Sequence, residues 1–188
     1  DVVKATAIQI MRKMKPQDIF SVVAFSDRAE EIISASRSTD LTKQEARIHM
    51  LQPSGGTEIF SGLEMGYNGI IRNLNNAQVN HIILLTDGRT YGDEDKCINL
   101  AHRASEQGVG ISGLGIGSEW NDIFLDDLAS CTGGSSMYVS RPEEIQKTLL
   151  AKFTRLGKSY AEETRMDFNI PEGIELRYAF RIQPEAGV

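Results

Sequence analysis

The sequence predicts an α/β protein with a Rossmann-like, mostly parallel sheet, helices on both faces of that sheet, and a C-terminal β-hairpin. Three observations predict this fold class. Short apolar strands alternate with amphipathic helices up to about residue 153. Several strands are apolar on both faces, as in parallel sheets that helices cover. After residue 154 the hydrophobic period changes to two. We therefore expect one domain over residues 1–153, and a linker and hairpin that begin a β-rich domain over 154–188.

The first quarter of the sequence is predicted to form a helix, two strands and a second helix. Apolar residues at helical spacing predict a helix over residues 1–14 with one buried face. The apolar run Ile19–Phe25 predicts a strand that is buried on both faces, and a short edge strand is expected beside it over Ala29–Ile33. Residues Thr42–Glu45 have the Ser/Thr-x-x-Glu form of a capping box, which predicts a second helix from Thr42 to about Met50.

The middle of the sequence repeats a strand-and-helix unit. A stripe of residues at three- and four-residue steps predicts a helix over 58–75. The elements that follow are a strand at 81–86, a helix at 94–107, a strand at 109–116, a helix around 122–129, a strand around 137–139 and a helix from Pro142. Ser140 precedes Glu143 by three residues, which predicts a second capping box at the start of the last helix. Repeated units of this kind imply a parallel sheet.

Beyond residue 154 apolar and polar residues alternate. One alternating run ends at Ile170, a turn follows at Pro171–Gly173, and a second run alternates five times without error. The apolar residues of the second run are Ile174, Leu176, Tyr178, Phe180 and Ile182. We expect a two-stranded antiparallel hairpin whose apolar face packs on another sheet or on a second copy of the chain, which gives a route to self-association.

Composition and charge disfavour several classes of function. The 188 residues are 40% hydrophobic and carry a net charge of −6, so a buried core is expected and nucleic-acid binding is not, because neutralising phosphates needs clustered Lys and Arg. No apolar run approaches the roughly 20 residues of a membrane-spanning helix. With no initiator Met or signal peptide at its start, the chain is expected to begin inside a longer protein.

The two cysteines, Cys97 and Cys131, are too few for a disulfide scaffold or a zinc site. Cys97 shares a helical face with Leu100, Ala101 and Ala104, so it is expected to be a small buried core residue. The spacing of the two cysteines leaves a single disulfide between them open.

Two segments place polar groups at the carboxyl ends of strands, where open parallel sheets bind their ligands. Ser54–Thr57 is a glycine-rich loop that brings a hydroxyl to the start of a helix, and Asp87 follows the most apolar strand. A hydroxyl and a carboxylate in one crevice suit a hard cation such as Mg²⁺, which takes oxygen ligands and keeps several waters. Thr57 and Asp87 are therefore candidate metal ligands.

Each candidate has a simpler structural interpretation. Thr57 could serve only as the N-cap of helix 58–75, and Asp87 with Gly88 could form only a turn. The acidic run Asp93–Asp95 is interpreted as the negative first turn of a helix, which the helix dipole favours. No catalytic residue is assigned.

Taken together, four stretches in this order resemble the von Willebrand factor A domain family over about residues 1–153. The stretches are Phe20–Asp27, Ser54–Thr57, Ile82–Gly88 and Ile111–Gly117. The resemblance implies a Rossmann-like sheet with a metal-ion-dependent adhesion site at its upper edge. Thr57 would then ligate Mg²⁺, or Mn²⁺ or Ca²⁺, directly or through water. Asp87 would bind the ion directly, or would bind a group that itself ligates the ion.

The sequence departs from the family pattern at its start. The family's first metal-binding segment, Asp-x-Ser-x-Ser, follows a central first strand, whereas this chain opens with the first helix. This stretch of chain alone is therefore not expected to bind the ion tightly. A central strand missing between those at 19–25 and 81–86 would leave backbone groups unpaired, so we expect residues upstream of Asp1 or a neighbouring chain to fill the position. Without that strand, helix 1–14 would lose the strand it packs against, and Ile10 and Met14 would be partly exposed.

The resulting hypothesis is a non-enzymatic protein-binding module whose partner supplies an Asp or Glu carboxylate to the bound cation. One alternative is a Mg²⁺-dependent phosphoryl-transfer enzyme with Asp87 as its nucleophile. Against it, no second acidic residue stands two places from Asp87. A further alternative is a structural scaffold that binds partners through its helices without a metal.

Overall fold

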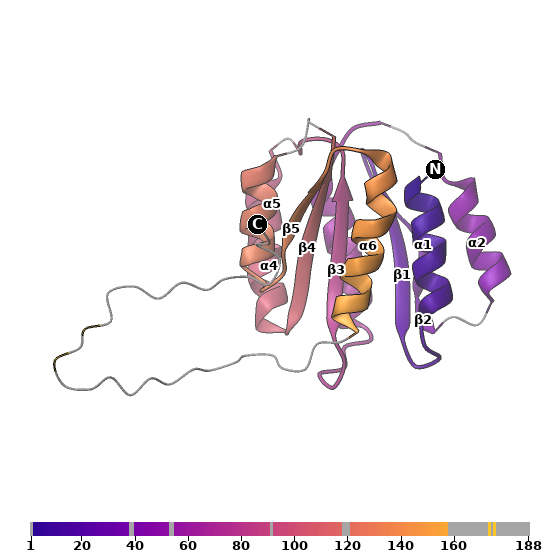
Figure 1. The fold of residues 1–188 in the computed structure, drawn as a ribbon, viewed down its shortest axis with the longest axis horizontal. Helices are drawn as coiled ribbons and strands as arrows, with labels where there is room; N and C mark the ends of the chain where they lie inside the picture. The colour runs from indigo at the N-terminus through magenta and orange to yellow at the C-terminus, as the bar shows by residue number, and fades with distance from the viewer. Residues whose placement is uncertain are drawn as a thin grey trace.

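The computed structural model describes residues 2–37, 40–52, 55–90, 92–117 and 121–157, together with the single residues 173 and 175. These residues form alternating helices and strands in an α/β fold (Figure 1). The hairpin predicted over 166–182 lies outside the described residues, and it stays a prediction.

Over the part of the chain that the structure describes, the strands form two separate sheets. β1 (Ile19–Phe25) pairs antiparallel with β2 (Ala29–Arg37), and β3 (Asn80–Thr86), β4 (Val109–Ile116) and β5 (Ser136–Val139) form a parallel sheet in that order. The mostly parallel sheet expected from the sequence is confirmed. β4 has the predicted bounds, whereas β2 runs four residues beyond the predicted edge strand because its pairing with β1 continues to Arg37.

In the described residues six helices cover the sheets: α1 (Val2–Lys13), α2 (Leu41–Met50), α3 (Ile59–Ile71), α4 (Glu94–Glu106), α5 (Asp122–Ser130) and α6 (Pro142–Leu156). α3, α4 and α5 pack on one face of the parallel sheet, in a core that includes Leu84 and Ile111. The alternate residues of the same strands, among them Leu85 and Leu114, face a second core under α1 and α6. Helices therefore cover both faces, as the strand–helix alternation predicts.

The helix caps differ from the sequence prediction. α2 begins one residue earlier than predicted, and its N-cap is Asp40, whose carboxylate accepts from Lys43 N at 3.0 Å. Thr42 is not the cap, and Glu45 instead pairs with Arg12 of α1 at 2.6 Å. The N-cap of α6 is Arg141, with no side-chain cap, so the capping box expected at Ser140 is also wrong. Asp40 lies two residues before Thr42 and Arg141 lies one residue after Ser140, so in both helices the predicted hydroxyl is out of register with the N-cap position.

β1 and β3 are not hydrogen-bonded to each other anywhere in the described part of the chain. All seven residues of β1 stay partly exposed, whereas most of β4, which has a neighbour on each side, is buried. Side chains still join the two sheets, because Phe20 of β1 and Leu85 of β3 pack in the same core cluster. In this part of the chain β1 is therefore paired with β2 alone and β3 with β4 alone, as the missing central strand predicts.

Helix α1 is better covered than expected. Ile10 was predicted to be partly exposed, but it is buried, at 8% exposure, in the cluster that α6 contributes to. Gln9 of α1 also accepts a hydrogen bond from Gln146 of α6 at 2.9 Å. Met14 is partly exposed, as predicted. α6 therefore provides much of the contact that the sequence assigned to a central strand.

Cys97 is fully buried on the same face of α4 as Leu100, Ala101 and Ala104, which confirms its predicted place in the core. Burial, together with the nearby charges of Asp93 and Glu94, raises the pKa of the Cys97 thiol to about 12. Cys97 and Cys131 are both free thiols, so they form no disulfide with each other.

The raised pKa of Cys97 predicts a loss of stability in alkaline solution. The thiol ionises in the unfolded chain near its usual pKa of 9.0 but not in the folded one until about 12. Its contribution is therefore complete below pH 9 and falls as the pH rises from 9 toward 12. Urea unfolding at about pH 8 and about pH 10.5 should show a smaller pH-dependent loss for Cys97→Ala than for the wild type. Equal losses would contradict the assignment.

Within the described residues, no helix combines the length and the apolar character needed to cross a membrane.

Candidate functional site

The carboxyl ends of β1 and β3 lie at the same edge of the molecule, because one loop contacts both. Glu58 N donates to the carbonyl oxygen of Ser26, just after β1, at 2.8 Å. Next to it, a Cβ added to Gly88, two residues after β3, would lie 2.8 Å from Thr57 Oγ1. The loop before α3 therefore spans the ends of the two strands, which run in the same direction.

Asp27 explains why this loop is rich in glycine. Its Oδ1 accepts a hydrogen bond from Gly56 N at 2.8 Å, so the carboxylate lies directly against the loop backbone. A Cβ on Gly55 would come within 2.4 Å of Asp27 Oδ2, and one on Gly56 within 2.5 Å of Oδ1. Gly55 also has a φ of +65°, which side chains disfavour. The glycines let Asp27 hold the loop that carries Thr57.

Thr57 is not the N-cap of α3. That position belongs to Glu58, which makes no side-chain cap bond. The Thr57 side chain is partly buried and makes no hydrogen bond among the described residues. Its hydroxyl lies against the backbone of Gly88, the residue that follows Asp87. The capping interpretation of Thr57 is therefore wrong, and its hydroxyl is placed beside the second candidate segment.

Asp87 is exposed at the end of β3. The bend there is held by the preceding residue, since Thr86 Oγ1 donates to the carbonyl oxygen of Gly88 at 2.9 Å and accepts from Gly88 N at 3.3 Å. Within the part of the chain that the structure covers, the Asp87 carboxylate makes no hydrogen bond or ion pair. Its carboxylate is not used by the bend and could ligate a cation.

Asp93 is a residue whose role the sequence did not indicate. It precedes α4, but its Oδ2 accepts from Phe60 N at 2.7 Å, and Phe60 lies in the first turn of α3. Thr90 Oγ1 accepts from Ile59 N at 3.4 Å and donates to Asp93 Oδ1. Glu94 and Asp95 do form the acidic first turn of α4, as predicted. Asp93 occupies the N-cap position of α4, but its side chain makes no cap bond there and instead binds the first turn of α3. No local pattern could reveal this contact, because its partners are 33 residues apart.

The oxygens at this edge are those that a hard divalent cation takes. Thr57 offers a hydroxyl, and Asp87 a carboxylate with no other described partner, so the donor set fits Mg²⁺. No group of three or more His, Cys, Asp or Glu side chains that could hold a metal is found in the described ranges. Two protein oxygens leave most of an octahedral shell to water or to other ligands, so further ligands would be needed for tight binding.

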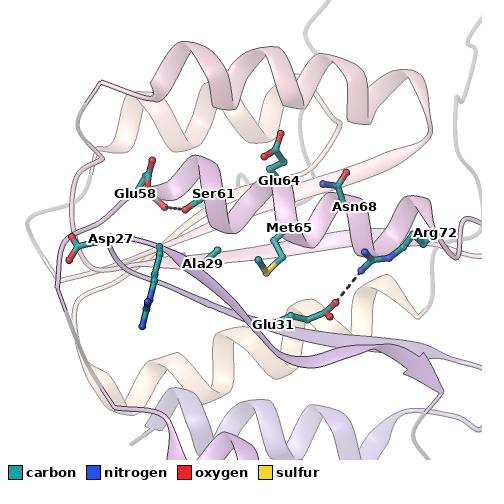
Figure 2. Close-up of a pocket in the computed structure, with 10 residues that line it drawn as sticks. Asp27, Ala29, Glu31, Glu58, Ser61, Glu64, Met65, Asn68 and Arg72 are labelled. Carbon is teal, nitrogen blue, oxygen red and sulfur yellow. Dashed lines mark hydrogen bonds and ion pairs between the residues drawn. The ribbon is translucent and has the colours of Figure 1, made fainter.

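An open groove of about 520 Å³ runs from this edge along the outside of the molecule, between the start of β2 and α3 (Figure 2). Asp27 lies at one end of the groove. At the other end Glu31 forms an ion pair with Arg72 at 3.2 Å. Glu58 and Glu64 line its α3 side. Four acidic side chains and two basic ones, Arg28 and Arg72, line the groove, so the surface beside the candidate ligands carries more negative than positive charge.

Comparison with known sequences gives one family and several relatives. The model of the von Willebrand factor type A domain matches residues 1–151. The uncharacterized protein sll0103 of Synechocystis sp. is 32% identical over 158 residues, which are 84% of this chain and 37% of that protein. The chain thus spans about a third of the length of this relative.

Solved structures share the fold. A von Willebrand factor type A structure from Catenulispora acidiphila has a TM-score of 0.70 at 18% identity and covers 82% of this chain and 38% of its own. Proximal thread matrix protein 1 from the mussel byssus, with a zinc-occupied MIDAS motif, has a TM-score of 0.64 at 23% identity and covers 82% and 39%. At these identities the likeness shows the fold.

Proposed function

Because this chain belongs to the von Willebrand factor type A domain family, we propose that it is a protein-binding module that engages its partner through a divalent cation held by Thr57 and Asp87. Domains of this family are typically interaction modules without enzymatic activity. The cation would be Mg²⁺, or Mn²⁺ or Ca²⁺, at the metal-ion-dependent adhesion site. The mussel protein, which shares the fold, has a zinc-occupied MIDAS motif, and this supports the proposal of a divalent ion.

The observation that carries the proposal is the contact between the two candidate segments. Thr57 Oγ1 lies against Gly88, immediately after Asp87, although the two segments are 30 residues apart in sequence. Neither side chain is used by a described hydrogen bond or ion pair. A hydroxyl and a carboxylate at the carboxyl edge of a sheet, with no structural role found for either, are consistent with ligand binding.

In this proposal the remaining ligands come from a strand that lies in the space between β1 and β3. A strand lying between them and parallel to both would end at the edge where Thr57 and Asp87 lie. Residues that follow such a strand would add oxygens to the site. The sequence resemblance implies an Asp-x-Ser-x-Ser segment in this place.

The partner contributes the last ligand. With Thr57, Asp87 and waters around the ion, one coordination position is left for a carboxylate of an Asp or Glu of the partner protein. The charge of that carboxylate is attracted by the cation, and its loss of water is compensated by the metal–oxygen bond. The affinity then depends on both the cation and the partner's acidic residue.

The proposal is tested with Mn²⁺, which enhances the relaxation of water protons while water stays in its coordination shell. Full-length protein loaded with Mn²⁺ should give an enhancement that falls when a peptide with one Asp is added, because the carboxylate displaces water. A peptide with Asn in place of Asp is the matched control. No enhancement with Mn²⁺, or an equal response to both peptides, would contradict the proposal.

The alternative functions give different results in two simple assays. Incubation with acetyl phosphate and Mg²⁺ should leave the intact mass unchanged, whereas a nucleophilic Asp87 would gain one phosphoryl group. Partner binding should be lost in excess chelator, whereas a scaffold that binds through its helices would keep it.

A further inference from the structure

The segments that carry Thr57 and Asp87 are fixed to each other by three contacts in succession. Thr57 Oγ1 lies against Gly88. Two and three residues further on, Ile59 N donates to Thr90 Oγ1 at 3.4 Å and Phe60 N donates to Asp93 Oδ2 at 2.7 Å. The last two contacts are joined, because the Thr90 hydroxyl donates to Asp93 Oδ1. Asp93 and Thr90 therefore hold the start of α3 to the loop after β3.

Asp93 is a buried carboxylate whose hydrogen-bond partners are not basic side chains. Its side chain is part of a residue only 6% exposed, and it makes no ion pair with a Lys, Arg or His among the described residues. Its oxygens are met by an N–H of α3 and by the Thr90 hydroxyl. A buried carboxylate is costly unless it is paired, and here Phe60 N at the positive end of α3 donates to it, while Asp93 also occupies the N-cap position at the positive end of α4.

The positive N-terminal end of α3 would also repel a cation bound beside it. Thr57 lies two residues before Ile59, the first residue of α3, so a cation held by Thr57 would sit near the partial positive charge of the helix N-terminus. The carboxylate of Asp93 offsets that charge in a poorly solvated place, where electrostatic interactions are stronger than in water.

From these contacts we infer that Asp93, with Thr90, is a positioning residue for the cation: it sets Thr57 against Asp87 and offsets the positive end of α3. The inference rests on the proposed function, since it concerns the same site. According to this inference, tight binding of the cation requires the negative charge of Asp93 in addition to Thr57 and Asp87. Asp93 touches the first turn of α3 and not the ion, and it acts through the position and the field of that helix.

The test compares Mn²⁺ with Tb³⁺ in the full-length protein by isothermal titration calorimetry. Asp93→Asn keeps an acceptor for Phe60 N but removes the charge. Loss of an outer partner typically lowers metal affinity about tenfold or more, so we expect about tenfold for Mn²⁺. Coulomb energy scales with ion charge, so the loss for Tb³⁺ should be about thirtyfold. Asp95→Asn, an exposed acid two residues on with the same charge change, should alter both affinities less than twofold.

A second variant separates position from charge. Thr90→Val removes the hydroxyl but keeps the Asp93 charge, so both affinities should fall by the same factor. Suppose that the wild type binds Mn²⁺. If Asp93→Asn then binds Mn²⁺ equally tightly, the inference is overturned while the proposed function stands. The same holds if the affinities of Asp93→Asn for Mn²⁺ and Tb³⁺ fall by the same factor and its circular dichroism shows that it has unfolded. If Thr90→Val leaves both affinities unchanged, the positioning role is overturned. If the wild type binds neither ion, the inference and the proposed function fail together.

Discussion

Asp87→Ala in the full-length protein is expected to abolish Mg²⁺- or Mn²⁺-dependent partner binding while the fold stays intact. Asp87 is exposed and makes no hydrogen bond or ion pair among the described residues, so its removal should change the free energy of unfolding by no more than about 0.5 kcal/mol. The measurement is calorimetric titration with Mn²⁺ beside thermal unfolding of the same sample. Asp95→Ala, an exposed acid in the first turn of α4, is the matched control.

Thr57→Ala is expected to weaken the same binding less than Asp87→Ala does, because a hydroxyl contributes no full charge to the cation. The structure removes one cost that the sequence predicted. Since Glu58 and not Thr57 is the N-cap of α3, the variant should not lose the roughly 1 kcal/mol of a helix cap. Undiminished Mn²⁺ binding in Asp87→Ala would show that the site is assigned to the wrong residues.

A strand placed between β1 and β3 is expected to stabilise the domain strongly. Such a strand, from residues preceding Asp1 or from a neighbouring chain, would pair with an open edge on each side. About six new backbone hydrogen bonds at roughly 1 kcal/mol each would raise the free energy of unfolding by on the order of 5 kcal/mol. The exchange of backbone amide hydrogens in β1 and β3 should slow in the protein that contains the strand.

Strand β4 provides the internal control for this measurement, because it is already paired with β3 and β5. Its amide protection should rise only with the global stability, whereas β1 and β3 should gain additional protection. Direct pairing of β1 with β3 in a protein that contains such a strand would be incompatible with this account, and with the topology that the sequence implies.

Periodicity was sufficient to predict the elements, because burial on one face or on both is written in consecutive residues. β4 was predicted at its observed bounds, and β3 differs by one residue. α3 ends at Ile71, four residues earlier than predicted, although Leu74 continues the apolar stripe and packs against the core beyond the helix. A stripe of apolar residues records which side chains are buried, and it does not record where the backbone leaves the helix.

The contacts that build the candidate site could be predicted only in part. The carboxyl ends of parallel strands meet at one edge, which is why the sequence could bring Thr57 and Asp87 to the same region. The cap of α3 could not be found in this way, because the local candidate Thr57 is displaced by Glu58 and the acceptors come from Thr90 and Asp93. Helix termini take whichever acceptor the tertiary structure brings, and this information is absent from local spacing.

The central claim is that Thr57 and Asp87 share a divalent cation. It is tested most directly by a crystal structure of the full-length protein grown with Mn²⁺ and measured for anomalous scattering. The account predicts an anomalous peak at the edge between β1 and β3, with Thr57 Oγ1 and an Asp87 carboxylate oxygen bound to the ion or to its waters. Mn²⁺ bound elsewhere, with no peak beside Thr57 and Asp87, would contradict it.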